Sequence, residues 1–180
     1  MDQIVRKKPA AVGKTVAFTG YRLQKMPFGF HEDCELCADF KRRLRNTIEM
    51  MIFEGYSHFI SGGALGMDMF AAEAVLQLRE KYPDVTLEIA IPFDDQSAKW
   101  AQEYRDREEL IRQQADVITW VGHVYTSGSM FARNRYMVNS CSVLLAAYDG
   151  QPGGTAMTID YARRSGKQIT IIRPVLKRSA

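Results

Sequence analysis

Short apolar runs alternate with longer stretches of helical period along most of the chain, and this alternation constrains the fold more than any other feature. Several runs are apolar at consecutive positions, as in parallel strands that are covered on both faces. Between them, apolar residues return at the three- and four-residue spacing of a helix. The expected strands are residues 15–19, 58–61, 85–91, 116–121, 142–148 and 168–172. The expected helices lie around residues 37–52, 71–78, 100–111, 130–141 and 155–164.

An alternation of strand and helix is typical of an α/β domain with a parallel sheet between two helical layers. We therefore expect a Rossmann-like three-layer α/β/α fold with a mostly parallel, doubly wound sheet of about six strands. A chain of 180 residues suits one domain with a substantial core. The expected division is a flexible N-terminal arm at residues 1–13, a single domain at 14–176 and a tail at 177–180.

The composition narrows the class of protein. Apolar residues make up 46% of the chain and charged residues 25%, which is typical of a folded globular protein. No run approaches the roughly 20 apolar residues of a membrane span, so we expect no membrane partner. The first residues lack the apolar core of a secretory signal and the three cysteines form no disulfide framework, which favours a cytoplasmic location. A net charge of +3 suits an anionic ligand without the strong basic bias of a dedicated DNA-binding domain.

Two glycine-rich turns follow expected strands and open expected helices. Ser61-Gly62-Gly63 and Gly66 form the first turn, and Gly153-Gly154-Thr155 forms the second. Such a turn admits a ligand close to the backbone and directs free N–H groups at an anion. A positive φ or close packing is enough to explain the glycines of any single turn of this kind. Two such turns on the same edge of one sheet favour a phosphate-bearing ligand. The glycine patterns of standard dinucleotide dehydrogenases and P-loop NTPases are absent.

Charged and polar side chains follow the same strand ends. Arg22 follows the first strand, and Arg133 and Asn134 lie near the start of the fourth helical stretch. The guanidinium of an arginine can bind a phosphate or a carboxylate through two hydrogen bonds. Arg133 and Arg135 cannot lie on the same face of a helix, so at most one of them should point into the site. Asp149 ends a buried strand, at the edge where such sheets bind ligands, and its carboxylate suits ribose binding or a role as general base. Asp68 lies in the first turn of an expected helix, where the helix dipole stabilises a carboxylate, and this structural role is enough to account for it.

Other candidates carry less weight. His31, Cys34 and Cys37 lie at helical spacing with no fourth ligand, so we expect an ordinary amphipathic helix and no metal site. Tyr21 and Tyr125 lie near loop ends, where their rings could stack on a base.

Four segments resemble the YpsA-like family of the SLOG superfamily, in the family's order. They are VAFTGYR, ISGGALGMDMFAAE, MFARNRYMV and YDGQPGGTAMTIDYA, and the resemblance runs from about Lys14 to about Pro174. The superfamily also contains the DprA recombination mediators and the LOG-type phosphoribohydrolases. The resemblance implies a Rossmann-like fold and a crevice for a nucleotide or a nucleotide-derived, ADP-ribose-like ligand.

Comparison with these two groups leaves two functions open. LOG-type enzymes carry a glutamate three residues after the threonine of their Pro-Gly-Gly-x-Gly-Thr segment, where this chain has Thr158, although Arg133 fits their arginine. Hydrolysis of an N-glycosidic bond would therefore need another carboxylate, such as Asp149 or Asp160. The SGGALGMD and FARNR segments resemble those of DprA proteins, which bind single-stranded DNA.

The sequence as a whole favours a nucleotide-binding domain that acts as a sensor or as a hydrolase of nucleotides or N-glycosides. A DprA-like module that binds single-stranded DNA is the alternative, and a homo-oligomer stays open. Arg133 and Asp149 are the candidate catalytic residues, and no cofactor is certain. The expected ligand-binding residues are Gly20, Tyr21, Arg22, Ser61, Gly62, Gly63, Gly66, Asp68, Arg133, Asn134, Asp149, Gly150, Gly153, Gly154 and Thr155.

Overall fold

The computed structural model describes residues 1–175, so the expected tail at 177–180 lies outside the described residues. The fold is α/β, with helices on both faces of one sheet. The strands are β1 (Asp2–Val5), β2 (Thr15–Gly20), β3 (His58–Ser61), β4 (Thr86–Ile91), β5 (Val117–Trp120), β6 (Val143–Ala147) and β7 (Gln168–Ile172). The α-helices are α1 (Glu35–Phe53), α2 (Met67–Lys81), α3 (Gln102–Gln114), α4 (Ser129–Asn139) and α5 (Gly154–Arg164). Two short 3-10 helices are η1 (Val12–Lys14) and η2 (Leu23–Lys25).

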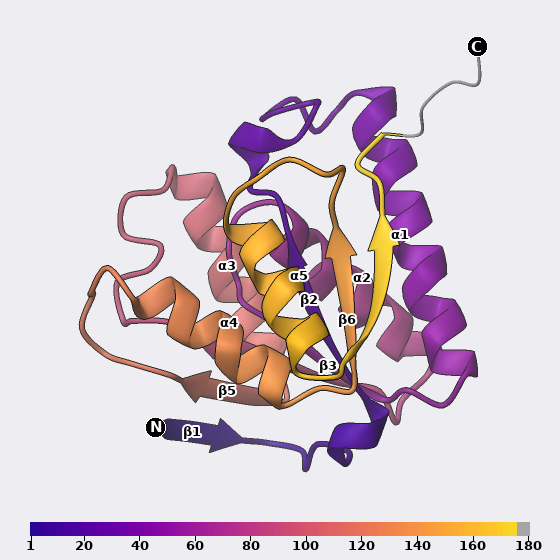
Figure 1. Cartoon of the computed structure of the whole chain (residues 1–180), viewed down its shortest axis with the longest axis vertical. Helices are drawn as coiled ribbons and strands as arrows, with labels where there is room; N and C mark the ends of the chain where they lie inside the picture. Colours follow the sequence, from indigo (N-terminus) through magenta and orange to yellow (C-terminus); the bar gives the residue numbers. More distant parts are fainter. Residues whose placement is uncertain (176–180) are drawn as a thin grey trace.

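The sheet has seven strands in the order β1-β5-β4-β3-β2-β6-β7. All neighbouring strands from β5 to β7 run parallel, which confirms the expected doubly wound topology. From β2 the chain proceeds outward through β3, β4 and β5, and then returns to the other side of β2 through β6 and β7. In Figure 1, α4 and α5 lie in front of the sheet, whereas α2 and α3 lie behind it.

The apolar pattern of the sequence accounts for this layering. β4 and β6 are buried along their whole length, and β2 along all but its last residue, because helices cover both faces of these strands. On α1 the buried residues return every three or four positions, as on a helix with one face against the sheet. They are Cys37, Phe40, Leu44, Ile48 and Met51.

The N-terminal segment corrects one expectation. Residues 2–5 form β1, which pairs antiparallel with β5, so this part of residues 1–13 is not the free arm that the sequence suggested. It also makes the sheet one strand wider than the expected six. All four residues of β1 are exposed, and an exposed edge strand carries no apolar alternation that a sequence could reveal.

The order of the strands indicates where on the sheet a ligand would bind. The connections that follow the adjacent strands β2 and β6 enter helices on opposite faces of the sheet, since α1 packs with α2 and α5 packs with α4. In open α/β sheets, ligands bind outside the carboxyl ends of the strands at such a switch point. Among the helices that the structure describes, none has the length and apolar character that a membrane crossing requires.

Candidate functional site

A cleft of about 290 Å³ lies at this switch point, beyond the carboxyl end of β2. The end of β2, the short helix η2 and the first turns of α2, α4 and α5 contribute to its walls. The lining residues are Phe18, Thr19, Gly20, Tyr21, Arg22, Gln24, Lys25, Ala64, Leu65, Asp68, Met130, Arg133, Asn134, Gly153, Gly154 and Thr155. Helix starts and cationic side chains therefore converge on one small space.

The amino end of α5 forms one wall of the cleft. Gly153 precedes the helix with a φ of 142°, a conformation that favours glycine, and no side chain caps the helix. Within residues 1–175, the backbone N–H groups of Gly154, Thr155 and Ala156 have no hydrogen-bond acceptor. A Cβ atom built at Gly153 would lie 3.1 Å from the Lys25 Nζ atom, so this ammonium stands beside the helix end. Three free N–H groups and a cation make the wall electropositive.

Arg133 and Asp68 form the opposite, buried part of the cleft. The Arg133 side chain is 5% exposed and the Asp68 side chain 10%, and 3.7 Å separates Arg133 Nη1 from Asp68 Oδ2. Arg133 Nη1 donates a hydrogen bond to the Gly62 carbonyl, and its Nε donates to Asn134 Oδ1 at 2.8 Å. Burial raises the pKa of Asp68 and lowers that of Arg133, while each charge opposes the shift of the other.

The first glycine turn packs against this pair and does not line the cleft. A Cβ atom at Gly62 would overlap the guanidinium of Arg133, so the glycine leaves the space that the arginine occupies. The Ser61 hydroxyl donates to the Asp68 carbonyl at 2.7 Å and accepts from the Gly63 N–H at 3.2 Å. These groups thus hold the start of α2 and the Arg133 side chain in place.

The structure brings nine of the expected ligand-binding residues to the cleft and leaves six outside its lining. Those in the lining are Gly20, Tyr21, Arg22, Asp68, Arg133, Asn134, Gly153, Gly154 and Thr155. Those outside it are Ser61, Gly62, Gly63, Gly66, Asp149 and Gly150. The Asp149 carboxylate accepts hydrogen bonds from the Tyr21 hydroxyl and, at 3.2 Å, from the Gln151 N–H. Tyr125 also lies outside the lining, 66% exposed, with its ring against Phe93.

Sequence reasoning missed Lys25 and Gln24, which line the cleft from η2. The loop after β2 shows no helical or strand period, so nothing in its pattern distinguishes these two side chains from others in the loop. The only available signal was their position, within five residues of the end of a central strand.

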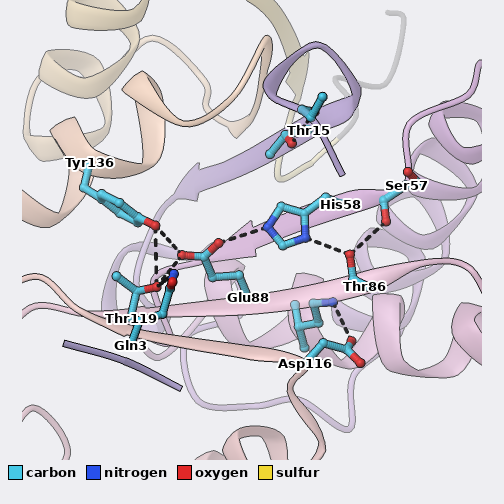
Figure 2. A network of polar contacts seen from close by, with 11 residues as sticks. Gln3, Thr15, Ser57, His58, Thr86, Glu88, Asp116, Thr119 and Tyr136 are labelled. Carbon is cyan, nitrogen blue, oxygen red and sulfur yellow. Dashed lines mark hydrogen bonds and ion pairs between the residues drawn. The ribbon is translucent and has the colours of Figure 1, made fainter. Parts of the chain in front are cut away.

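A second polar cluster lies on the α4 side of the sheet and centres on Glu88, as Figure 2 shows. One oxygen of the buried Glu88 carboxylate accepts from Thr119 at 2.7 Å and Tyr136 at 2.6 Å, and the other contacts His58 Nε2 at 2.9 Å. Burial acts to raise the pKa of Glu88, but these hydrogen bonds outweigh it and hold the pKa below its usual value. Tyr136 lies one helical turn after Arg133, so this cluster anchors the helix that carries Arg133.

Curated proteins with similar sequences include UPF0398 proteins of the genus Bacillus. A UPF0398 protein of Bacillus thuringiensis (strain Al Hakam) is 29% identical over 157 residues, which span 86% of this chain and 85% of that protein. A UPF0398 protein of Bacillus cereus (strain AH187) matches to the same extent.

Two solved structures share the fold. DNA processing protein A of Helicobacter pylori, described for its binding of single-stranded DNA, superposes with a TM-score of 0.60 at 19% identity. DprA of Streptococcus pneumoniae superposes with a TM-score of 0.62 at 17% identity. Each match covers 87% of this chain but only 64% and 49% of those two chains, respectively, so this chain spans less than two thirds of either.

The family model described as the YspA SLOG family matches residues 16–175. This range begins at the second residue of β2 and ends after β7, so it includes nearly all of the parallel part of the sheet and every residue that lines the cleft. The chain therefore belongs to the YpsA family of SLOG proteins.

Proposed function

We propose that the cleft binds the phosphate of a nucleotide or of a nucleotide-derived ligand such as ADP-ribose. The observation that carries this proposal is the uncapped amino end of α5, which opens into the cleft beside Lys25. Free N–H groups, the helix dipole and an ammonium together favour an anion with several acceptor oxygens. Arg22 adds a second cation to the same lining.

The volume of the cleft suits a small ligand, or one part of a larger ligand. Pockets for small molecules commonly occupy about 300–1,000 Å³, and the cleft, at about 290 Å³, lies just below this range. It suits one phosphorylated sugar or a mononucleotide unit, and the rest of a larger ligand such as ADP-ribose would extend past its rim. Tyr21 lies in the lining, and its side chain is held by the Asp149 carboxylate and the Tyr148 ring.

Binding as a sensor is favoured over hydrolysis of an N-glycosidic bond. The Thr158 hydroxyl, at the position of the LOG-type glutamate, donates to the Gly154 carbonyl at 2.9 Å and accepts from Asn134 at 3.0 Å. These contacts are structural and supply no proton acceptor for catalysis. Of the two other carboxylates, Asp149 is bound by Tyr21 and Asp160 pairs with Arg164, and both lie outside the lining.

A thermal-shift titration with nucleoside mono- and diphosphates, NAD and ADP-ribose tests the proposal. A ligand that binds only the native state adds about 2.7 kcal/mol of stability at 100 times its Kd. For a domain of this size, that corresponds to a rise in Tm of roughly 5–11 °C. Lys25→Ala should reduce the shift because it removes the ammonium beside α5. Lys8→Ala is the matched control, since Lys8 is exposed and its neighbour Lys7 bonds the Pro83 carbonyl just before β4 begins, at the other end of the strands.

Single-stranded DNA is the second candidate ligand, and the fold shared with the DNA-binding protein of Helicobacter pylori favours it. A fluorescence anisotropy titration with a labelled oligothymidylate separates the two candidates. Tight binding of the oligomer that Lys25→Ala weakens, with no thermal shift from any nucleotide in the panel, would replace the first proposal with the second.

A further inference from the structure

The carboxylate of Asp68 faces the cleft with most of its hydrogen-bonding capacity unused. Its side chain is nine-tenths buried, yet no side chain of residues 1–175 donates a hydrogen bond to it, since Arg133 Nη1 lies at 3.7 Å. The backbone N–H of Ala64 is a donor to this carboxylate and acts to lower the pKa of Asp68. A carboxylate offers about four acceptor positions, and Asp68 lies in the lining of the cleft. The remaining positions are therefore open to a donor group of a ligand.

The surroundings of Asp68 define the chemistry of that group. It must donate hydrogen bonds because an ionised carboxylate only accepts them. A cationic group would meet the positive charges of Arg133 and Arg22, both of which act on Asp68. A neutral donor escapes this repulsion. Two adjacent hydroxyl groups can use both carboxylate oxygens at once.

We infer that Asp68 receives the 2- and 3-hydroxyl groups of a ribose whose phosphate lies at the amino end of α5. The inference rests on the proposed phosphate site and adds a specificity to it: the cleft takes ribose phosphates in preference to 2-deoxyribose phosphates. Asp68 thereby takes the role that the sequence suggested for Asp149, whose carboxylate lies outside the lining and is bound by Tyr21.

The test uses probes that carry no base. Ribose 5-phosphate, 2-deoxyribose 5-phosphate and inorganic phosphate are titrated into the ¹⁵N-labelled full chain, and Kd values are taken from amide shifts. We expect ribose 5-phosphate to bind about tenfold more tightly than 2-deoxyribose 5-phosphate, since one hydrogen bond to a charged group accounts for a factor of this size. The Gly154 and Thr155 amides should shift with all three probes.

Two variants then test whether Asp68 causes the preference for ribose 5-phosphate over 2-deoxyribose 5-phosphate. Asp68→Asn should bring the ratio of the two Kd values close to one, while binding of 2-deoxyribose 5-phosphate is kept. Glu73→Gln is the matched control, because Glu73 lies on the same helix and its carboxylate binds Arg107. The wild-type ratio should persist in this variant. A ratio, unlike a single affinity, is insensitive to a general loss of stability or to the change in net charge.

The outcomes separate this inference from the phosphate site on which it rests. Equal affinity for the two sugar phosphates, or a ratio that survives Asp68→Asn, overturns the ribose assignment and leaves the phosphate site standing. No binding of any of the three probes or of the nucleotide panel overturns the phosphate site itself. A ratio that is lost in Asp149→Asn but kept in Asp68→Asn would return the ribose role to Asp149.

Discussion

Asp68 Oδ2 lies 3.7 Å from Arg133 Nη1 at the base of the cleft, and both side chains are almost fully withdrawn from solvent. Each charge is the nearest compensation for the other, because burial alone raises the pKa of Asp68 and lowers that of Arg133. The pair therefore links the stability of the domain to the electrostatics of its candidate site.

Arg133→Met should destabilise the protein by about 3–5 kcal/mol at neutral pH, because it leaves a buried carboxylate without a counterion. The difference in unfolding free energy between the wild type and the variant should become smaller as the pH falls. Without the arginine the pKa of Asp68 rises further, and a protonated Asp68 needs no counterion. Urea unfolding at pH 7.5 and pH 5 measures both effects. Arg135→Met, on the same helix with its guanidinium over the Tyr161 ring, should cost about 1 kcal/mol or less. A deficit that stays constant with pH would contradict the coupling.

Gly153→Val should remove the phosphate-dependent thermal shift and destabilise the protein by about 1–3 kcal/mol, because a φ of 142° strains any L-residue. Its Cβ would also crowd the Lys25 ammonium at 3.1 Å. Gly154→Ala is the comparison for stability, since a Cβ there meets no atom within 4 Å. Differential scanning fluorimetry with and without nucleotide measures both quantities. If Gly153→Val folds as stably as the wild type and still binds, the amino end of α5 is not the phosphate site.

Glu88→Gln should destabilise the protein by about 3 kcal/mol at pH 7, because it removes the charge on which three side chains converge. The folded-state pKa of Glu88 is lowered from 4.5, so its stabilising contribution is present above that pH and is lost as the pH falls through the folded-state pKa. The gap between wild type and variant should therefore close in acid. Chemical unfolding between pH 7 and pH 3 tests this, with exposed Glu80→Gln as the control.

One cysteine of the three should react with a thiol reagent in the native protein. Cys37 and Cys141 are fully buried, so a reagent cannot reach them in the folded protein, and burial raises the pKa of both thiols, that of Cys141 to about 11. Cys34 is half-buried at the start of α1 and is the expected reactive thiol. Titration with Ellman's reagent should give one fast equivalent, which Cys34→Ser abolishes, and three equivalents after denaturation. A second fast equivalent in the native protein would contradict this assignment.

The sequence predicts the parallel sheet well because a buried strand must be apolar on both faces. The same reasoning predicts the place of the cleft, since the carboxyl ends of the strands share one edge. It does not predict which glycine turn faces the cleft. The space beside Gly62 is filled by an arginine 71 residues later, and only the folded chain brings the two together. Lys25 escapes prediction for a similar reason, because its neighbour Gly153 comes from a distant helix start.

The pairing of β1 with β5 also dictates an order of assembly. Gln3 Nε2 donates a hydrogen bond to Thr119 Oγ1 across 116 positions of the chain, so β1 and β5 can pair only after much of the polypeptide between them has been made. Loop-closure entropy makes such a distant contact a late one. Until β1 docks, β5 presents an open edge of unpaired backbone groups to other chains in the cell. β1 thus covers the edge of the sheet that β5 would otherwise expose.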